Sequence, residues 1–343
     1  MRPLRIGVIG AGGNTRKLHL PGFQRLPGVT VAAVANRTPE SGARVAAEFG
    51  IPRVAGHWRE IVEAPDVDAV CIGTWPYLHA ELTIAALRAG KHVLTEARMA
   101  RGLAEAEAMQ AEALRHPGLV TQIVPAPMSL AYDAAVRSLL DSGRLGRLRE
   151  IVLTHTTAAA LDPATPLSWR QDFELSGKNT LTLGIFYEVV LRWLRREPEA
   201  VSASARILTP ERRDESGRLR RVLIPDVLVL KADYADGMQL AGHFSAVEPA
   251  APRSEIRLHG TNADLHLDFL AGQAVLTPAG GTAEALPAGG PGWNVEADFV
   301  ASIREGRPVE LTNFATGVAY MRFTESVWQS WNAGGARVPV RPA

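Results

Sequence analysis

The chain has 343 residues, more than one hydrophobic core usually serves, so its length predicts two domains. With 37 Lys and Arg against 36 Asp and Glu, there is no strong net charge to attract nucleic acid or an acidic membrane surface, and a small molecule is the expected partner. A single cysteine excludes an internal disulfide, and the lack of a leader or of a membrane-length apolar run predicts a cytoplasmic location.

The amino-terminal segment predicts a strand that runs into a phosphate-binding turn. An apolar run from Leu4 breaks into glycines at Gly10, Gly12 and Gly13. Gly10 permits a tight turn, Gly12 lets the backbone approach a pyrophosphate, and the following helix would direct its amide groups at that charge. Thr15 stands where the usual fingerprint has its third glycine. On this motif alone, a Gly-rich turn of some other α/β protein remains open.

Strand-like and helix-like segments alternate along the first third of the chain. The pattern predicts strands at 29–35, 69–72 and 92–95, and helices at 39–49, 77–89 and 103–114. This order is typical of a parallel sheet with crossover helices, and it predicts a Rossmann-type domain over residues 1–122.

The pattern changes beyond residue 122. A helix is expected at 130–142 and a strand at 150–156, followed mostly by strands, among them an antiparallel hairpin over 227–234 and 238–244. The charged stretch 211–221, with a central Ser-Gly, is interpreted as a solvated hairpin tip. Two helices, at 295–304 and 314–331, end a second domain that we expect over residues 123–343.

Two further polar segments follow predicted parallel strands. One runs from Thr74 to His79 and the other from Glu96 to Arg98. Ligands of an open parallel sheet bind beyond the carboxyl ends of its strands, so these segments are expected to share one cleft with the glycine turn.

These segments, with several later motifs, make the chain resemble the Gfo/Idh/MocA family of nicotinamide-dependent oxidoreductases, named after glucose–fructose oxidoreductase, inositol dehydrogenase and a rhizopine-catabolism protein. The motifs that carry the resemblance are Pro76-x-x-His79, Gly90-Lys-His, Trp169-Arg170, Gly260-Thr-Asn-Ala and Ile303-Arg-Glu-Gly-Arg-Pro. The resemblance implies an α/β protein: a Rossmann domain, then an α/β domain whose open, mostly antiparallel sheet often joins copies as a homodimer or homotetramer.

The resemblance also implies which residues hold the cofactor. They are Gly10, Gly12, Gly13, Asn14, Thr15, Thr74, Trp75, Pro76, His79, Glu96 and Ala97. After the strand at 29–35 come Asn36 and Arg37, where an NAD enzyme usually presents an acidic residue to the adenine ribose. An arginine suits a 2′-phosphate, so NADP is expected rather than NAD, unless Arg37 is merely solvated or stacked on adenine.

The family's catalytic positions are altered in this chain. Its Glu-Lys-Pro segment corresponds to Glu96-Ala97-Arg98, and its Asp-x-Gly-x-His helix has Thr182 and Phe186 at the ionisable positions. Oxidising an alcohol requires a group that accepts the hydroxyl proton as hydride leaves, and these replacements cannot titrate. Lys178, in the loop that enters this helix, is the candidate for a substitute proton relay, with an exposed loop lysine as the alternative.

Five residues are candidates for substrate binding. Arg98 could hold a carboxylate or phosphate, or simply point outward, and Trp169 and Arg170 could stack on and hydrogen-bond to a sugar. Asn179 lies beside Lys178, and Tyr187 is a candidate for which packing is the favoured interpretation.

Other histidines give weaker signals. His155 could face the cleft from its strand, although a place in the core or on the sheet surface is favoured. His266 and Asp268 share a strand face, but two ligands without a third make a weak metal site, so no metal is predicted.

The sequence therefore predicts an NAD(P)-dependent oxidoreductase of a sugar, polyol or related cyclic hydroxy compound, with hydride transfer and a non-standard proton relay. Two alternatives remain open. One is a glycosidase or lyase that uses nicotinamide without net redox change, and the other is a cofactor-binding sensor that has lost catalysis.

Overall fold

The computed structural model of the chain describes residues 2–341, which form two compact units. The first unit runs to Pro125 and takes in Asn294–Val318, and the second holds Ala126–Trp293 and the chain from Ala319 onward. The first unit thus ends three residues beyond the expected 122 and includes 294–318, which the sequence prediction left in the second domain. Contacts distant in sequence cause the difference, because α9 (Val295–Glu305) packs on α1 (Leu20–Gln24).

The first unit is built on a five-stranded parallel sheet, as the alternation predicted. Its order is β2 (Val29–Ala35), β1 (Leu4–Ile9), β3 (Ala69–Ile72), β4 (His92–Thr95) and β5 (Thr121–Ile123). The chain leaves β1 for β2 and then passes back beyond β1 to β3, so the topological switch point lies between β1 and β3. Nucleotides bind at the carboxyl ends of such strands.

Crossover helices connect these strands close to the predicted positions. They are α2 (Pro39–Phe49), α4 (Pro76–Arg88) and α5 (Leu103–Arg115); the short helix α3 (Trp58–Val62), which lies between α2 and β3 in the chain, was not predicted. The Thr38 side chain caps α2 by accepting from the Ser41 N–H at 3.3 Å, and Gly50 ends the helix in the left-handed conformation. A π-helical turn, η1 (Thr15–His19), precedes α1 and was not predicted.

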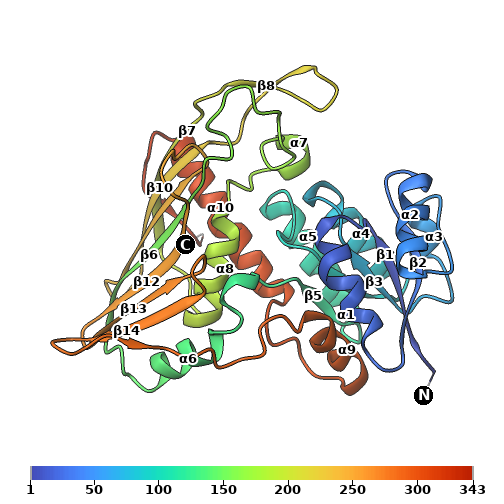
Figure 1. The fold of residues 1–343 in the computed structure, drawn as a ribbon, viewed down its shortest axis with the longest axis horizontal. Helices are drawn as coiled ribbons and strands as arrows, with labels where there is room; N and C mark the ends of the chain where they lie inside the picture. Colours follow the sequence, from blue (N-terminus) through green and yellow to red (C-terminus); the bar gives the residue numbers. More distant parts are fainter. Residues whose placement is uncertain (1, 342–343) are drawn as a thin grey trace. The chain divides into compact units, whose positions relative to one another are not determined.

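The second unit is built on an open nine-stranded sheet, and the prediction of a mostly antiparallel sheet is confirmed. Among the strands of this sheet within residues 2–341, only β6 and β11 pair in parallel. The helices α8 (Leu183–Leu194) and α10 (Phe314–Asn332) lie against one face (Figure 1). The strand order is β15 (Glu284–Ala285), β14 (Gln273–Pro278), β13 (Ala263–Asp268), β12 (Arg253–Gly260), β6 (Leu148–Thr156), β11 (Gln239–Ser245), β10 (Val227–Asp233), β7 (Ala200–Arg206) and β16 (Val338–Pro339).

A short helical region leads into this sheet. The helix expected at 130–142 forms as a 3-10 turn, η2 (Pro127–Ser129), followed by α6 (Asp133–Asp141). A further short helix, α7 (Phe173–Ser176), precedes α8.

A buried ionic network joins the start of the second unit to α8. Arg192 donates to both carboxylate oxygens of Glu188 at 3.1 and 3.0 Å, donates to Ser129 Oγ at 2.7 Å and lies 3.1 Å from Asp133 Oδ2. Glu188 also accepts the Ala126 N–H at 2.9 Å. The Arg192 and Glu188 side chains are only 5% and 4% exposed. Since charges withdrawn from water need such partners, the network fixes residues 126–133 onto α8.

The charged stretch 211–221 forms the expected hairpin, β8 (Glu211–Arg213) and β9 (Leu219–Arg221), but it is not solvated throughout (Figure 1). Arg212 is 1% exposed, and its guanidinium donates to carbonyl oxygens of the 160–165 loop at 2.7 to 2.9 Å. These acceptors are backbone atoms about fifty residues earlier in the chain, which is why the local charge pattern did not reveal the contact. Arg212 therefore fixes the loop that follows β6.

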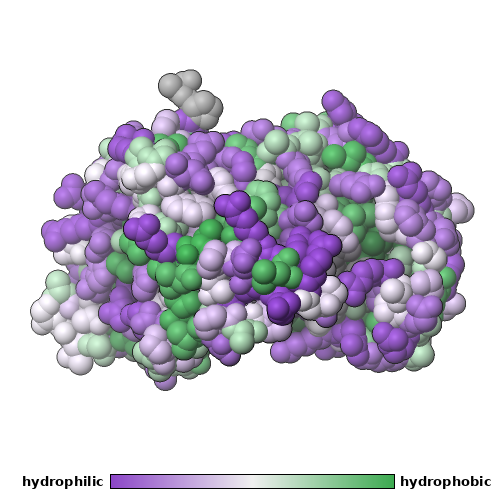
Figure 2. All heavy atoms as spheres, turned by 90° about the horizontal axis from the view of Figure 1, so that it is seen from above, coloured by the Kyte–Doolittle hydropathy of each residue, from purple (hydrophilic) through white to green (hydrophobic). Residues whose placement is uncertain are grey.

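The surface is polar over the face shown in Figure 2, where hydrophobic residues form smaller patches among hydrophilic ones. Within residues 2–341, no helix is long and apolar enough to cross a membrane.

Candidate functional site

The glycine turn lies at the carboxyl end of β1, beside the switch point. Gly10 adopts φ = 86°, and a Cβ there would stand 2.7 Å from the backbone nitrogen of Thr74, so only glycine fits. Gly12 and Gly13 are exposed, with open space or a single distant neighbour where a Cβ would stand. The Gly12 N–H closes the turn by donating to the Gly10 carbonyl oxygen at 3.0 Å, and the exposed backbone at Gly13 remains accessible to a pyrophosphate, so the turn fits a dinucleotide.

Thr15 occupies the place of the missing third glycine, and a glycine on the neighbouring strand makes room for it. A Cβ at Gly73 would approach Thr15 Oγ1 to 2.1 Å and the Gly10 carbonyl oxygen to 2.3 Å. The Thr15 hydroxyl donates to that carbonyl oxygen at 3.2 Å. The close packing that a glycine usually permits at position 15 is thus provided by Gly73.

The end of β2 is attached to the same turn. The Asn36 side-chain oxygen accepts the Ala11 N–H at 2.7 Å, and Arg37 follows as an exposed side chain. Asn36 is therefore a structural part of the turn as well as a candidate ribose ligand, and Arg37 lies where it can reach solvent.

The segment from Thr74 begins α4, with Trp75 at the N-cap and Pro76 in the first turn. His79 is fully buried: its Nδ1 lies 2.9 Å from the Arg98 carbonyl oxygen and its Nε2 3.0 Å from that of Thr74. Burial lowers the pKa of His79, against the effect of these carbonyl oxygens. The expected cofactor contact of His79 is therefore corrected to an indirect role, in which it joins the Thr74 and Arg98 segments.

A buried group of charged side chains lies next to the glycine turn, and it was not predicted from the sequence. His19 is wholly buried, with Nδ1 2.5 Å from Glu296 Oε1 and Nε2 3.1 Å from Glu96 Oε1. Asn14 also donates to Glu96. Glu296 lies in α9, 277 residues beyond His19, so no spacing rule could have connected them. The group anchors Glu96, a candidate cofactor ligand, next to the turn.

The protonation of this group follows from its contacts. Burial disfavours a charged His19, but hydrogen bonds to Glu296 and Glu96 outweigh it and raise the pKa of His19 to about 9. Burial likewise acts against ionised Glu96, yet hydrogen bonds from His19 and Asn14 hold its pKa below the usual value. At neutral pH His19 is therefore a charged imidazolium that contacts Glu96 and Glu296.

Raising the pH is therefore expected to weaken the first unit. The folded pKa of about 9 exceeds the ordinary 6.5, so the imidazolium contributes its full stability below pH 6.5 and loses it as the pH rises through about 9. We expect the loss in unfolding free energy to be on the order of 3 kcal/mol. Urea unfolding of the wild type and of His19→Gln across this range would measure it. If the unfolding free energy changed with pH equally in the two proteins, the raised pKa of His19 would be contradicted.

The residues that follow Glu96 are enclosed. Arg98 is 4% exposed, so the alternative of an outward-pointing arginine is wrong, while its role toward a substrate stays a prediction. Ala97 is half-buried, and the peptide bond between it and Arg98 is cis.

In the second unit, Trp169 and Arg170 lie in the segment between β6 and α7. The Arg170 guanidinium carbon is 4.2 Å from the centre of the Trp169 ring, a cation–π arrangement. Trp169 is half-buried and Arg170 is exposed, so both retain surface that a ligand can reach.

Lys178 and Asn179 lie in the loop between α7 and α8. Lys178 forms an ion pair with Glu325 of α10, and its side chain is 33% exposed. Asn179 is fully buried and donates to the Ser176 carbonyl oxygen at 2.7 Å, so its visible role is to hold the loop. An ammonium group held by a carboxylate is a hydrogen-bond donor, which is the chemistry that Lys178 offers here.

The first turns of α8 carry an aromatic cluster. Tyr187 is fully buried and stacks on Phe323 of α10 with 3.8 Å between the ring centroids. Burial raises the pKa of Tyr187 well above the ordinary value. This geometry supports the packing interpretation of Tyr187 and corrects its assignment as a substrate ligand. Phe186 is surrounded by the rings of His155, Phe244 and Phe269, at centroid distances of 5.4, 5.6 and 6.1 Å.

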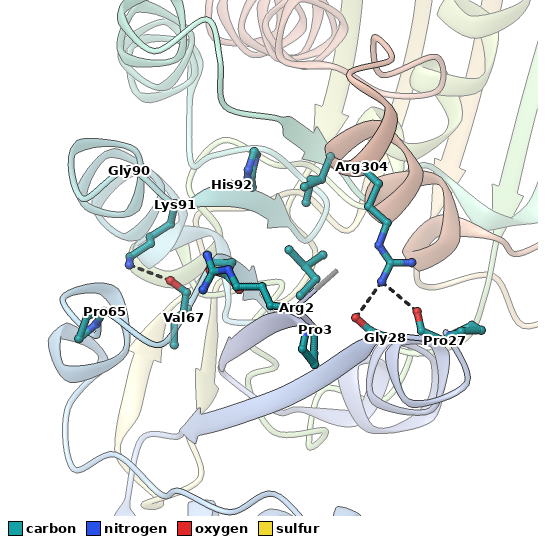
Figure 3. A pocket seen from close by; sticks show the side chains of 13 residues that line it. Arg2, Pro3, Pro27, Gly28, Pro65, Val67, Gly90, Lys91, His92 and Arg304 are labelled. Carbon is teal, nitrogen blue, oxygen red and sulfur yellow. Dashed lines mark hydrogen bonds and ion pairs between the residues drawn. The ribbon is translucent and has the colours of Figure 1, made fainter.

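A hollow of about 780 Å³ lies at the opposite, amino-terminal edge of the parallel sheet. Lys91 donates to the Val67 carbonyl oxygen at 2.8 Å, and Arg304 donates to those of Pro27 and Gly28 at 2.9 and 2.7 Å (Figure 3). These basic side chains already donate hydrogen bonds to backbone carbonyl oxygens. The hollow is also remote from the carboxyl ends of the strands. We therefore place the candidate site at the glycine turn and not here.

Comparison with known proteins agrees with the assignment of the first unit as a Rossmann domain. Residues 4–122 match the model described as an oxidoreductase family with an NAD-binding Rossmann fold, and residues 134–266 match the GFO/IDH/MocA C-terminal domain. Levoglucosan dehydrogenase of Pseudarthrobacter phenanthrenivorans is 31% identical over 226 residues, which cover 63% of this chain and 57% of that protein. A dTDP-3,4-didehydro-2,6-dideoxy-alpha-D-glucose 3-reductase of Streptomyces antibioticus is 30% identical over 322 residues, covering 90% and 91%. The fold of apo levoglucosan dehydrogenase matches with a TM-score of 0.89 at 24% identity over 100% of both chains.

Proposed function

Because the chain belongs to the Gfo/Idh/MocA family of oxidoreductases, we propose that it is an NAD(P)-dependent oxidoreductase of a sugar, polyol or related cyclic hydroxy compound. The observation that carries the proposal is the open backbone of Gly12 and Gly13 at the switch point of the parallel sheet. The substrate class is supported by two relatives whose names state reactions on an anhydrosugar and on a nucleotide-linked sugar.

Residues of each unit can be assigned a role in the proposed reaction. A bound nicotinamide would supply or accept the hydride. The amide group of Gly13 would hold the pyrophosphate, and Glu96 would bind beside it. In the second unit, Trp169 would stack on a sugar face while Arg170 donates to its hydroxyl groups. Lys178, with Glu325 as its counter-charge, would take part in the proton relay as a donor to the reacting oxygen.

A panel of sugars, polyols and glycosides incubated with NAD⁺ or NADP⁺ tests the proposal, with the absorbance of reduced nicotinamide as the readout. We expect reduction of the cofactor by at least one sugar or polyol. Product from a glycoside without net change in the cofactor would support a non-redox glycosidase or lyase. Cofactor binding without turnover of any compound would support the sensor.

We also propose that the enzyme prefers NADP to NAD. Asn36 leaves no carboxylate at the end of β2 to repel a 2′-phosphate, and the neighbouring Arg37 is exposed and can donate two hydrogen bonds to it. Replacing Arg37 with alanine is expected to raise the dissociation constant for NADPH about 10- to 100-fold, because hydrogen bonds to a charged group are lost. The constant for NADH should change little.

Fluorescence titration with both reduced cofactors measures this change. Arg44→Ala removes another exposed arginine of α2 and serves as the control that should leave both constants unchanged. Asn36→Asp should move the preference toward NADH. A ratio of the two constants that is the same in the wild type and Arg37→Ala would refute the NADP preference.

We further propose that copies associate as a homodimer or homotetramer through the sheet face that α8 and α10 leave open. Val229 on that face is 50% exposed and makes it partly apolar. Light scattering after gel filtration would determine the assembly.

A further inference from the structure

Oxidation of an alcohol releases a hydroxyl proton, and none of Ala97, Thr182 and Phe186 can receive it. Lys178 is held by Glu325 and acts as a donor. We propose that His155, in the second unit, is the residue that accepts this proton. The inference deepens the proposed function and rests on it.

His155 lies where the candidate substrate segments of the second unit begin. It is the last residue but one of β6, and the chain that follows carries Trp169 and Arg170. Its ring is 5.4 Å, centroid to centroid, from that of Phe186 in the first turn of α8, directly after the Lys178 loop. The end of β6 therefore places an imidazole beside the first turn of α8.

The ring is arranged as a base. Its Nδ1 lies 3.4 Å from Ser254 Oγ, which leaves Nε2 without a hydrogen bond to any residue from 2 to 341. His155 is half-buried, so Nε2 can meet both a substrate and solvent. Burial lowers its pKa below the ordinary value, which keeps the ring neutral at pH 7 and able to accept a proton.

No other histidine of the nine combines these properties. His19 and His79 are buried and have both ring nitrogens occupied. Five others accept from backbone groups or pair with carboxylates, and these are His57, His92, His116, His259 and His266. His243 precedes Phe244, which pairs across the strands with His155, so it points to the opposite face of the sheet.

The step balances in protons and electrons. In oxidation the O–H bond would break, its proton would move to His155 Nε2, and the oxygen would keep the electron pair of that bond to form the carbonyl. A bound nicotinamide would supply the acceptor for the hydride that leaves the carbinol carbon. The imidazolium then returns to neutral by losing one proton to solvent. Reduction runs the same transfers backwards, with the imidazolium as the acid.

Turnover of His155→Gln, using the sugar identified in the panel, tests the inference. We expect kcat to fall about 10²- to 10⁴-fold, as for loss of a general base, with unchanged NADPH affinity. The wild type should lose activity at acidic pH as the ring becomes protonated, and the variant should lack this limb of the profile. His243→Gln changes a histidine of the adjacent strand on the other face and should keep wild-type activity.

Two further measurements separate catalysis from packing against Phe186. Added imidazole should restore part of the activity of His155→Gly, which it could not do if the ring only filled space. Labelling with diethyl pyrocarbonate, mapped by mass spectrometry, should modify His155 without cofactor present, whereas fully buried His79 should remain unlabelled.

The outcomes are distinct. Turnover by His155→Gln at the wild-type rate, or an unlabelled His155, overturns the inference and leaves the proposed function intact. Absence of turnover in the wild type across the panel refutes the proposed function, and the inference falls with it.

Discussion

Replacing Lys178 with alanine is expected to lower kcat about 10²- to 10³-fold, the effect of removing one donor to a developing oxyanion. The dissociation constants for NADH and NADPH should not change, because Lys178 is not among the residues assigned to the cofactor. In the wild type, Glu325 holds the ammonium group in place. Stopped-flow turnover with the sugar found in the panel, combined with cofactor titration, measures both quantities.

Two variants sharpen this expectation. Lys231→Ala removes an exposed lysine of β10 and is the matched control, for which kcat should stay at the wild-type value. Lys178→Ala should retain the acid limb that we assign to His155, since the proton acceptor is still present. Unchanged kcat in Lys178→Ala would exclude the lysine from the reaction.

Replacing Arg192 with alanine is expected to destabilise the second unit by about 3–5 kcal/mol, because it leaves the carboxylates of Glu188 and Asp133 buried without their cation. Removal of the guanidinium also deprives the Ser129 hydroxyl of its donor. Urea unfolding followed by tryptophan fluorescence measures the loss, since Trp193 lies beside the network and donates to Asp133 at 2.7 Å.

An exposed ion pair in the same unit gives the comparison. Arg144 pairs with Glu284, and both side chains are about half exposed, so Arg144→Ala should change the unfolding free energy by less than about 1 kcal/mol. A double variant, Glu188→Leu with Arg192→Met, should lose less stability than Arg192→Ala, since it removes the Glu188–Arg192 pair together and leaves only Asp133 without its cation. Equal effects of Arg192→Ala and Arg144→Ala would show that the buried network contributes nothing particular.

Much of the fold could be predicted because its signals are local. The strands at 29–35, 69–72 and 92–95 agree residue for residue with β2, β3 and β4, since each is a short apolar run bounded by turn residues. The π-helical turn at Thr15–His19 could not be predicted, because its hydrogen-bond register depends on packing and not on side-chain periodicity.

The candidate site divides in the same way. The glycine turn was predicted because its chemistry lies in consecutive residues, and the position of Gly10 against Thr74 agrees with that prediction. Exposure was not predictable from spacing, so His79 and Tyr187 were assigned ligand contacts although both are fully buried. His155 was noticed, but its open Nε2 depends on which neighbours β12 and α8 bring to it.

The long-range pair of His19 and Glu296 has a consequence for folding during synthesis on the ribosome. A ribosome releases the first unit's strands early, yet Glu296 and the rest of 294–318 emerge only after nearly all of the second unit has been made. Until then, a nascent first unit has its buried imidazole without one of the two carboxylates that sustain its charge. The first unit is therefore begun first, but it is completed only after residues 126–293 of the second unit have been made.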